Sequence, residues 1–272
     1  MKKFIVNFIK GTLIGIGAVL PGLSGGALAA VFGIYEPLMA FLSNIKKQFM
    51  KNVCYFFPFM LGGLFGIYLL SHVLNYLLAH NLAELSIFFV GCMLGVFPTL
   101  VKQAGKKGQK VTHLIIAIIA TVVSFMLLTT FSSHSEALSV QTASWYLWAL
   151  SGSLIGLGLT FPGLSPSNFL IFLGLYQPIN LAISNLDFPV LMPVAIGGIV
   201  TVLTTAKLVT YVLGKFYAVV YHVILGLVIT STVMIVPRNF NSGFVLAICL
   251  LAGLMIGMFM TYIENNAKEK VV

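Results

Sequence analysis

Hydrophobic residues form long stretches along this chain, and polar residues gather in the short segments between them. Six stretches are each near the roughly 20 residues that a membrane-spanning helix needs. We predict spanning helices at about 53–79, 85–101, 111–131, 188–214, 216–236 and 243–263. Two further apolar regions are different, because a proline–glycine turn interrupts each of them.

The two interrupted regions are copies of one another. Residues 11–44 and 152–185 align without a gap at an offset of 141, and fourteen of the 34 positions are identical. A weaker match continues at an offset of 135, where Pro58 and Tyr76 correspond to Pro193 and Tyr211. Such internal repeats are typical of transporter folds. We expect one transmembrane domain over residues 1–272, with repeat 1 at about 4–131 and repeat 2 at about 145–263.

Each interrupted region is predicted to be a re-entrant helical hairpin. The apolar arms lie at about 4–20 and 27–42 in the first copy, and at about 145–161 and 168–183 in the second. An arm of about 16 residues rises only about 24 Å, which is less than the ~30 Å hydrocarbon core. Each repeat is therefore expected to be a hairpin followed by three transmembrane helices in an all-α protein. A pair of fully spanning helices is the alternative for each hairpin.

Composition and charge support a multi-pass membrane protein. Hydrophobic residues make up 59% of the chain and charged residues 8%, with a mean hydropathy of +1.05. The net charge of +9 comes from short lysine clusters between apolar stretches, as in cytoplasmic loops beside anionic lipid, and not from a nucleic-acid-binding face.

The lysine positions also predict the topology. With both termini in the cytoplasm, thirteen lysines lie inside, only Arg238 lies outside, and Lys207 lies within a helix. Three spans then separate the hairpins. The repeats are therefore expected to be inverted, with their two tips meeting near the middle of the membrane.

The tips are the candidate anion site. A helix starts just after each turn, and its first N–H groups lack intrahelical partners and carry partial positive charge. Two opposed helix starts suit phosphate. The candidate substrate-binding residues are Pro21, Gly22, Ser24, Gly25, Gly26, Pro162, Gly163, Ser165, Ser167 and Asn168. Ordinary helix caps and packing turns would use the same residue types.

Two ionisable residues are also candidates, because charges inside a membrane are costly and commonly functional. Lys207 is expected to contact the phosphate, and its repeat mate is His72. Glu36 is the candidate for carrying a coupling ion, H⁺ or Na⁺, and its mate is Gln177. Lys207 is only eight residues from Lys215, so extension of its side chain to the cytoplasmic surface is the alternative.

The sequence around PGLSGG, the following GIYEP and their second copies resembles the polyprenyl-phosphate translocases. The resemblance covers nearly the whole chain. It implies a flippase of the bacterial inner membrane that returns undecaprenyl phosphate from the outer to the inner leaflet for reuse in cell-wall synthesis. It also places binding residues at Pro21, Gly22, Ser24, Gly25 and Gly26 and at their mates. The second motif differs, since Pro166-Ser167-Asn168 replaces Gly25-Gly26-Ala27, so the two tips need not contact phosphate equally.

Other functions stay open at this point. A carrier of a small soluble anion would use the same tips. In an intramembrane serine protease, Ser24 within G-x-S-x-G would be the nucleophile, with His72, His113 or His222 as the base. The second copy of the motif loses that pattern. We expect a transporter and not an enzyme, with membrane lipids around it and no cofactor or metal. Two G-x-x-x-G pairs, Gly91/Gly95 and Gly253/Gly257, are typical of helix packing within one chain or in a homo-oligomer.

Overall fold

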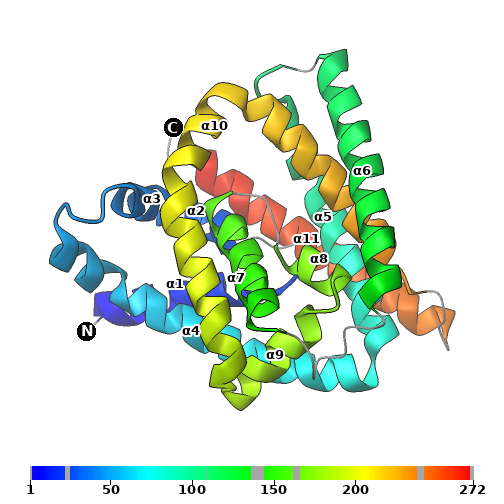
Figure 1. Ribbon diagram of the computed structural model, residues 1–272, viewed down its shortest axis with the longest axis horizontal. Helices are drawn as coiled ribbons and strands as arrows, with labels where there is room; N and C mark the ends of the chain where they lie inside the picture. Colours follow the sequence, from blue (N-terminus) through cyan, green and yellow to red (C-terminus); the bar gives the residue numbers. More distant parts are fainter. Residues whose placement is uncertain are drawn as a thin grey trace.

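The computed structural model describes residues 2–21, 25–108, 110–135, 144–161, 166–237 and 242–269. All regular structure within these ranges is helical, as predicted. The helices are α1 (Lys2–Val19), α2 (Gly25–Val31), α3 (Tyr35–Ser43), α4 (Phe49–His80), α5 (Leu82–Gly105), α6 (Val111–Ser135), α7 (Trp145–Thr160), α8 (Pro166–Phe172), α9 (Tyr176–Asn185), α10 (Phe188–Ile235) and α11 (Gly243–Glu269) (Figure 1).

The long helices agree with a membrane protein. Among the described residues, four segments are long and apolar enough to cross a bilayer: α4, α5 and the two parts of α10, Phe188–Val209 and Tyr211–Ile235. Shorter apolar helical stretches lie in α6 and α11. The six predicted spans fall in these helices. The fourth and fifth are joined into one arched helix, which is bent where Phe216 leaves helical geometry (φ −120°, ψ 30°) (Figure 1).

The second arm of each hairpin is not one helix. The sequence predicted continuous arms at about 27–42 and 168–183, but the structure divides them into α2 and α3, and into α8 and α9. The breaks are at Gly33 (φ 70°) and Gly174 (φ 69°), in the left-handed region that glycine adopts without strain. After each glycine, the next N–H donates to a carbonyl five residues back, which is the Schellman way of ending a helix.

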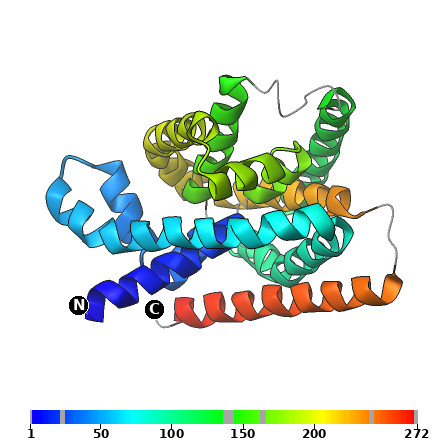
Figure 2. The ribbon, with the colours of Figure 1, turned by 90° about the horizontal axis from the view of Figure 1, so that it is seen from below.

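Close glycine contacts pair the first arm of each hairpin with the first long helix of the same repeat. Gly15 of α1 packs on the carbonyl of Gly63 in α4, and an added methyl group would overlap that carbonyl. The repeat mates Gly156 of α7 and Gly198 of α10 pack together in the same way. Figure 2 shows α4 lying across α1. These glycines are therefore explained by backbone approach, as in other membrane helix pairs.

The last helix of each repeat packs against the other repeat. Gly91 and Gly95 of α5 pack on Gly253 and Gly257 of α11, so both predicted G-x-x-x-G pairs contact each other within the chain. The equivalent contact in the other direction joins α10 to α6, where Gly226 lies against the Ala117 carbonyl. The second long helix of each repeat thus packs on the third helix of the other repeat.

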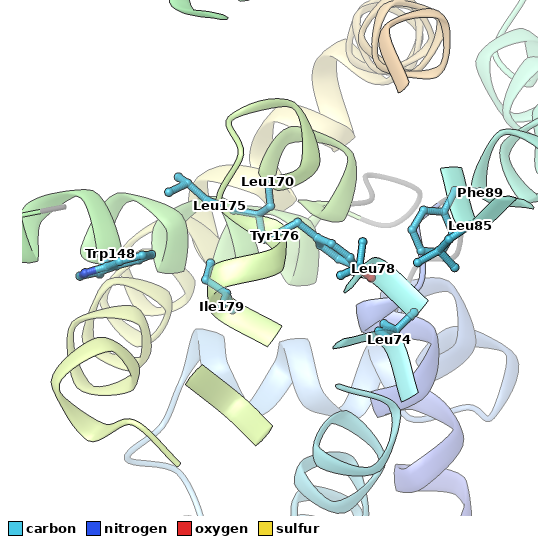
Figure 3. Close-up of a cluster of buried hydrophobic side chains, with 9 residues drawn as sticks. All are labelled: Leu74, Leu78, Leu85, Phe89, Trp148, Leu170, Leu175, Tyr176 and Ile179. Carbon is cyan, nitrogen blue, oxygen red and sulfur yellow. The ribbon is translucent and has the colours of Figure 1, made fainter. Parts of the chain in front are cut away.

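The largest buried hydrophobic cluster in the part of the chain that the structure describes also lies between the repeats (Figure 3). It contains Leu74, Leu78, Leu85, Phe89, Trp148, Leu170, Leu175, Tyr176 and Ile179. Tyr176 reaches across it and meets the ring of Phe89 edge-on, with 6.0 Å between the ring centroids. This cluster fixes the second hairpin against α4 and α5 of the first repeat.

Candidate functional site

The ends of the hairpin arms lie inside the protein. Pro21, two residues past the end of α1, is fully buried, and so is Thr160 at the end of α7. α1 contacts α8, and α7 contacts α2, so each hairpin touches the helix end of the other. Non-helical backbone at membrane depth is tolerated only where protein buries it or where it lines a cavity. The burial of these helix ends satisfies what a position inside the membrane would require.

Two tyrosines join the hairpins through reciprocal hydrogen bonds. The hydroxyl of Tyr35 donates to the carbonyl of Thr160 at 2.7 Å, and the hydroxyl of Tyr176 donates to the carbonyl of Val19 at 3.0 Å. The tyrosines are repeat mates, and so are the residues of the two carbonyls. The contact is therefore two-fold in character, like the self-complementary contact of a symmetric dimer. The repeat alignment marked both tyrosines as identical, but the sequence assigned them no role.

Ser167 ties the start of α8 to the end of α1. Its Oγ lies 2.9 Å from the carbonyl oxygen of Val19 and 3.2 Å from that of Ala18, and the side chain is 2% exposed. A serine hydroxyl has one proton, and here that proton is directed to these carbonyls. In this conformation Ser167 positions the tip and offers no proton to an anion.

The start of α2 is packed on α1 as well. A Cβ atom added to Gly25 would lie 2.8 Å from the Cβ of Ala18 and 3.2 Å from the carbonyl oxygen of Ile14. Pro166, the repeat mate of Gly25, covers Gly158 in the same region of the second hairpin. Close approach of the two arms therefore explains the glycine at 25, whether or not an anion also lies near its backbone.

The structure locates only part of the predicted set. Pro21, Gly25, Gly26 and Ser167 are buried at the tips. The structure does not describe the side chain of Asn168. The other predicted tip residues lie entirely outside the described residues: Gly22, Ser24, Pro162, Gly163 and Ser165. Because α2 and α8 have only seven residues each, a positive potential at their starts would come from the N–H groups of the first turn more than from a long helix dipole.

Glu36 and Lys207 are not buried with the tips. Glu36 is in the first turn of α3, and Lys207 is in α10 beside the fully buried Ala206; both charged side chains are exposed. Their repeat mates Gln177 and His72 are exposed too. Both residues lie on one pair of packed helices, because α3 contacts α10.

A polar cluster between α4 and α9 was missed by the sequence reasoning. Ser71 Oγ donates to Asn180 Oδ1 at 2.9 Å, and Asn75 Nδ2 donates to the Asn180 carbonyl at 2.9 Å and to Ser184 Oγ at 2.6 Å. The sequence does contain a signal for this cluster. Ser71 and Asn75 are four residues apart in one apolar helix, and Asn180 and Ser184 are four apart in another, so each pair shares a helix face. The cluster holds the second hairpin on the first repeat.

Comparison with known proteins gives consistent results. The sequence profile of the undecaprenyl phosphate translocase-like family matches residues 14–244. The polyprenyl-phosphate transporter of Staphylococcus aureus is 28% identical over 267 residues, which cover 93% of this chain and 94% of that protein. The polyprenyl-phosphate transporter of Vibrio cholerae is 23% identical over 250 residues, which cover 86% and 78%. No solved structure matches the chain significantly.

Proposed function

The chain belongs to the undecaprenyl phosphate translocase-like family, and from that premise we propose that it moves undecaprenyl or another polyprenyl phosphate from the outer to the inner leaflet of a bacterial cell membrane. The transported lipid would then serve again as a carrier in cell-wall synthesis. The chain is a membrane protein with relatives named as polyprenyl-phosphate transporters. The direction and the recycling role belong to the proposal.

The reciprocal tyrosine contact is the observation that supports this mechanism most strongly. It joins the helix ends of two repeated hairpins at a buried place. In the proposed cycle the hairpins are re-entrant and inverted, and this structure is the closed state. A headgroup enters when the tips separate and the two tyrosine bonds break. Each such bond contributes only about 0.5–1.5 kcal/mol, so an open state is accessible.

A phosphate needs donors along its whole path, because moving an unpaired charge into hydrocarbon is prohibitive. In the open state, the N–H groups at the starts of α2 and α8 would face the headgroup, with hydroxyl and amide donors from Ser24, Ser165, Ser167 and Asn168. Breaking the contact to Val19 would release the Ser167 proton for this purpose. The polyprenyl tail would remain among the lipids, where the large exposed hydrophobic side chains of the long helices lie.

Charged side chains have secondary roles in the proposal. Lys207 would attract the headgroup from the exposed side of α10, and Glu36 would carry a coupling ion, H⁺ or Na⁺. No covalent chemistry is required for transport, so the protein is proposed to act as a carrier and not as an enzyme. The thirteen-to-one distribution of basic residues supports cytoplasmic termini.

The test is a leaflet-specific assay in proteoliposomes that contain only the purified protein. Polyprenyl phosphate placed in one leaflet should become accessible in the other faster than in protein-free liposomes. Labelled inorganic phosphate or sulfate should not enter. Entry of the soluble anions without movement of the lipid would show a small-anion carrier instead. Labelling by a fluorophosphonate would show an activated serine.

A further inference from the structure

A cavity of about 310 Å³ lies between α5, α6 and α10, beyond the hairpin tips. Its lining residues are Val101, Ala104, Lys110, Val111, Leu114, His222 and Leu225. Met93 of α5 marks the level of the second hairpin, because Ile171 of α8 packs against its buried cluster. Val101, the first lining residue on α5, lies about eight residues or about 12 Å farther along that helix. Small-ligand pockets commonly measure roughly 300–1,000 Å³, so this cavity could hold a compact headgroup.

His222 lines this cavity, and His113 lies directly beside it. The rings of His113 and His222 lie 5.2 Å apart between centroids. His222 is 6% exposed, and its Nδ1 donates to the Ala218 carbonyl at 2.7 Å, so Nε2 is its remaining polar atom. Nδ1 of His113 is buried and has no hydrogen-bond partner among the described residues. Buried polar atoms in proteins nearly always have a hydrogen-bond partner, so a bound ligand is a candidate partner for this nitrogen.

The charged groups around the cavity are all cationic among the described residues. Lys110 lines it. Lys107 is near the same end of the helices, with Nζ 5.2 Å from the centroid of the Tyr217 ring and 3.4 Å from the Gly214 carbonyl oxygen. No carboxylate is among the lining residues. An anion is therefore the ligand that this lining favours.

The repeat shows that helix packing does not require the histidines. Gly226 packs on the Ala117 carbonyl as Gly91 packs on the Leu250 carbonyl. These equivalent contacts align α10 with α5 at an offset of 135 and α6 with α11 at an offset of 133. His222 then corresponds to Ile87, and His113 corresponds to Leu246. The same positions of the other repeat are thus filled by apolar side chains.

We propose that His113, His222 and Lys110 form a second site for a phosphate monoester, separate from the hairpin tips, which receives the lipid headgroup after it has crossed. This rests on the proposed function. The apolar walls, Val101, Leu114 and Leu225, would cover the first isoprenyl unit of the tail. The lysine distribution assigns this end of the helices to the cytoplasm, so the site would deliver the headgroup to the inner leaflet.

The test is a titration of the full-length protein, labelled with ¹⁵N-histidine in nanodiscs, with farnesyl phosphate as a short substrate. The signals of His113 and His222 should move, whereas those of the exposed His72 and His80 should not. His113→Leu and His222→Ile introduce the residues found at the mated positions, so each variant should fold and provides the signal assignment.

Affinity for farnesyl phosphate should fall by at least about tenfold in His222→Ile or Lys110→Gln, because each removes a bond to a charged group. The matched controls His72→Leu and Lys106→Gln should change it less than about twofold. Unmoved signals of His113 and His222 would overturn the site. Equal shifts with inorganic phosphate at the same concentration would overturn the assignment to a lipid headgroup. Failure of the proposed function would appear separately, as absent translocation in proteoliposomes.

Discussion

Replacing Tyr35 by phenylalanine removes one of the two reciprocal bonds between the hairpins and leaves the ring in place. The Tyr35 hydroxyl is the described donor to the Thr160 carbonyl. The Val19 carbonyl, by contrast, accepts from both Tyr176 and Ser167. The two bonds look equivalent in the repeat, but their loss should have different consequences.

The difference can be estimated from hydrogen-bond energetics. Tyr35→Phe leaves a buried carbonyl without its described donor, which should cost about 1–3 kcal/mol in the free energy of unfolding. Tyr176→Phe leaves the Val19 carbonyl bonded to Ser167, so the cost should be only about 0.5–1.5 kcal/mol. In a Ser167→Ala background, Tyr176→Phe removes the last described donor and should then cost as much as Tyr35→Phe. The Tyr176 and Ser167 substitutions should therefore be more damaging together than the sum of the two alone.

Thermal unfolding of the purified variants in nanodiscs would measure these costs. For chains of 150–250 residues, about 1 kcal/mol corresponds to a shift of about 2–4 °C in the midpoint. Tyr146→Phe is the matched control, because Tyr146 is 61% exposed and should stay within about 0.5 kcal/mol of the native protein. If Tyr35→Phe unfolds at the same temperature as Tyr146→Phe, or if the Tyr176 and Ser167 effects simply add, the reciprocal bonds do not hold the tips closed.

Three further predictions concern orientation, charge and the polar cluster. In a protein without native cysteines, Ser133→Cys should react with an impermeant thiol reagent in intact cells and Gln109→Cys should not; external labelling of Gln109→Cys would reverse the topology. Lys207→Gln should slow transport in proteoliposomes more than Lys215→Gln if it attracts the headgroup, and equal mild effects would assign Lys207 to the membrane surface. Asn180→Leu should lower the free energy of unfolding by about 1–3 kcal/mol, because it leaves the buried Ser71 hydroxyl without its acceptor; a change below about 0.5 kcal/mol would show that the cluster is not stabilising.

Much of the fold could be predicted because the membrane restricts the choices. Apolar stretches of suitable length become helices when lipid offers no hydrogen bonds, and the six predicted spans fall in helices of the structure. The break inside the second arm was missed. Gly33 stands in an apolar segment where a glycine can equally continue a helix, and only its positive φ shows that the helix ends there. The sequence also predicted two separate spans at about 188–214 and 216–236, whereas the structure has one helix, α10, that bends at Phe216. A bend within a helix and a short loop between two helices have the same sequence pattern.

The candidate site was predicted as a set of motif residues and not as a set of contacts, and phosphate binding by these residues stays a prediction. The motif led directly to Pro21, Gly25 and Ser167, and the structure buries all three where the hairpins meet. The tyrosine bonds could not be predicted, because they join residues 125 and 157 positions apart. Nor could the sequence show that Gly25 is closely packed on α1. A loss of transport in Gly25→Val would therefore report damaged packing as readily as lost phosphate binding.

Residues that match between the two repeats explain how the helices pack. Positions at which the repeats differ are therefore the candidates for a functional difference between the two halves. Matched glycines pair the same helices twice, and matched tyrosines close the same contact twice. A carrier whose halves were identical would present equal sites to the two leaflets. This chain instead places His113 and His222 in one repeat interface where the other has Leu246 and Ile87. A difference in headgroup affinity between the two faces does not drive net transport, but it decides on which side the headgroup stays longest once it has crossed.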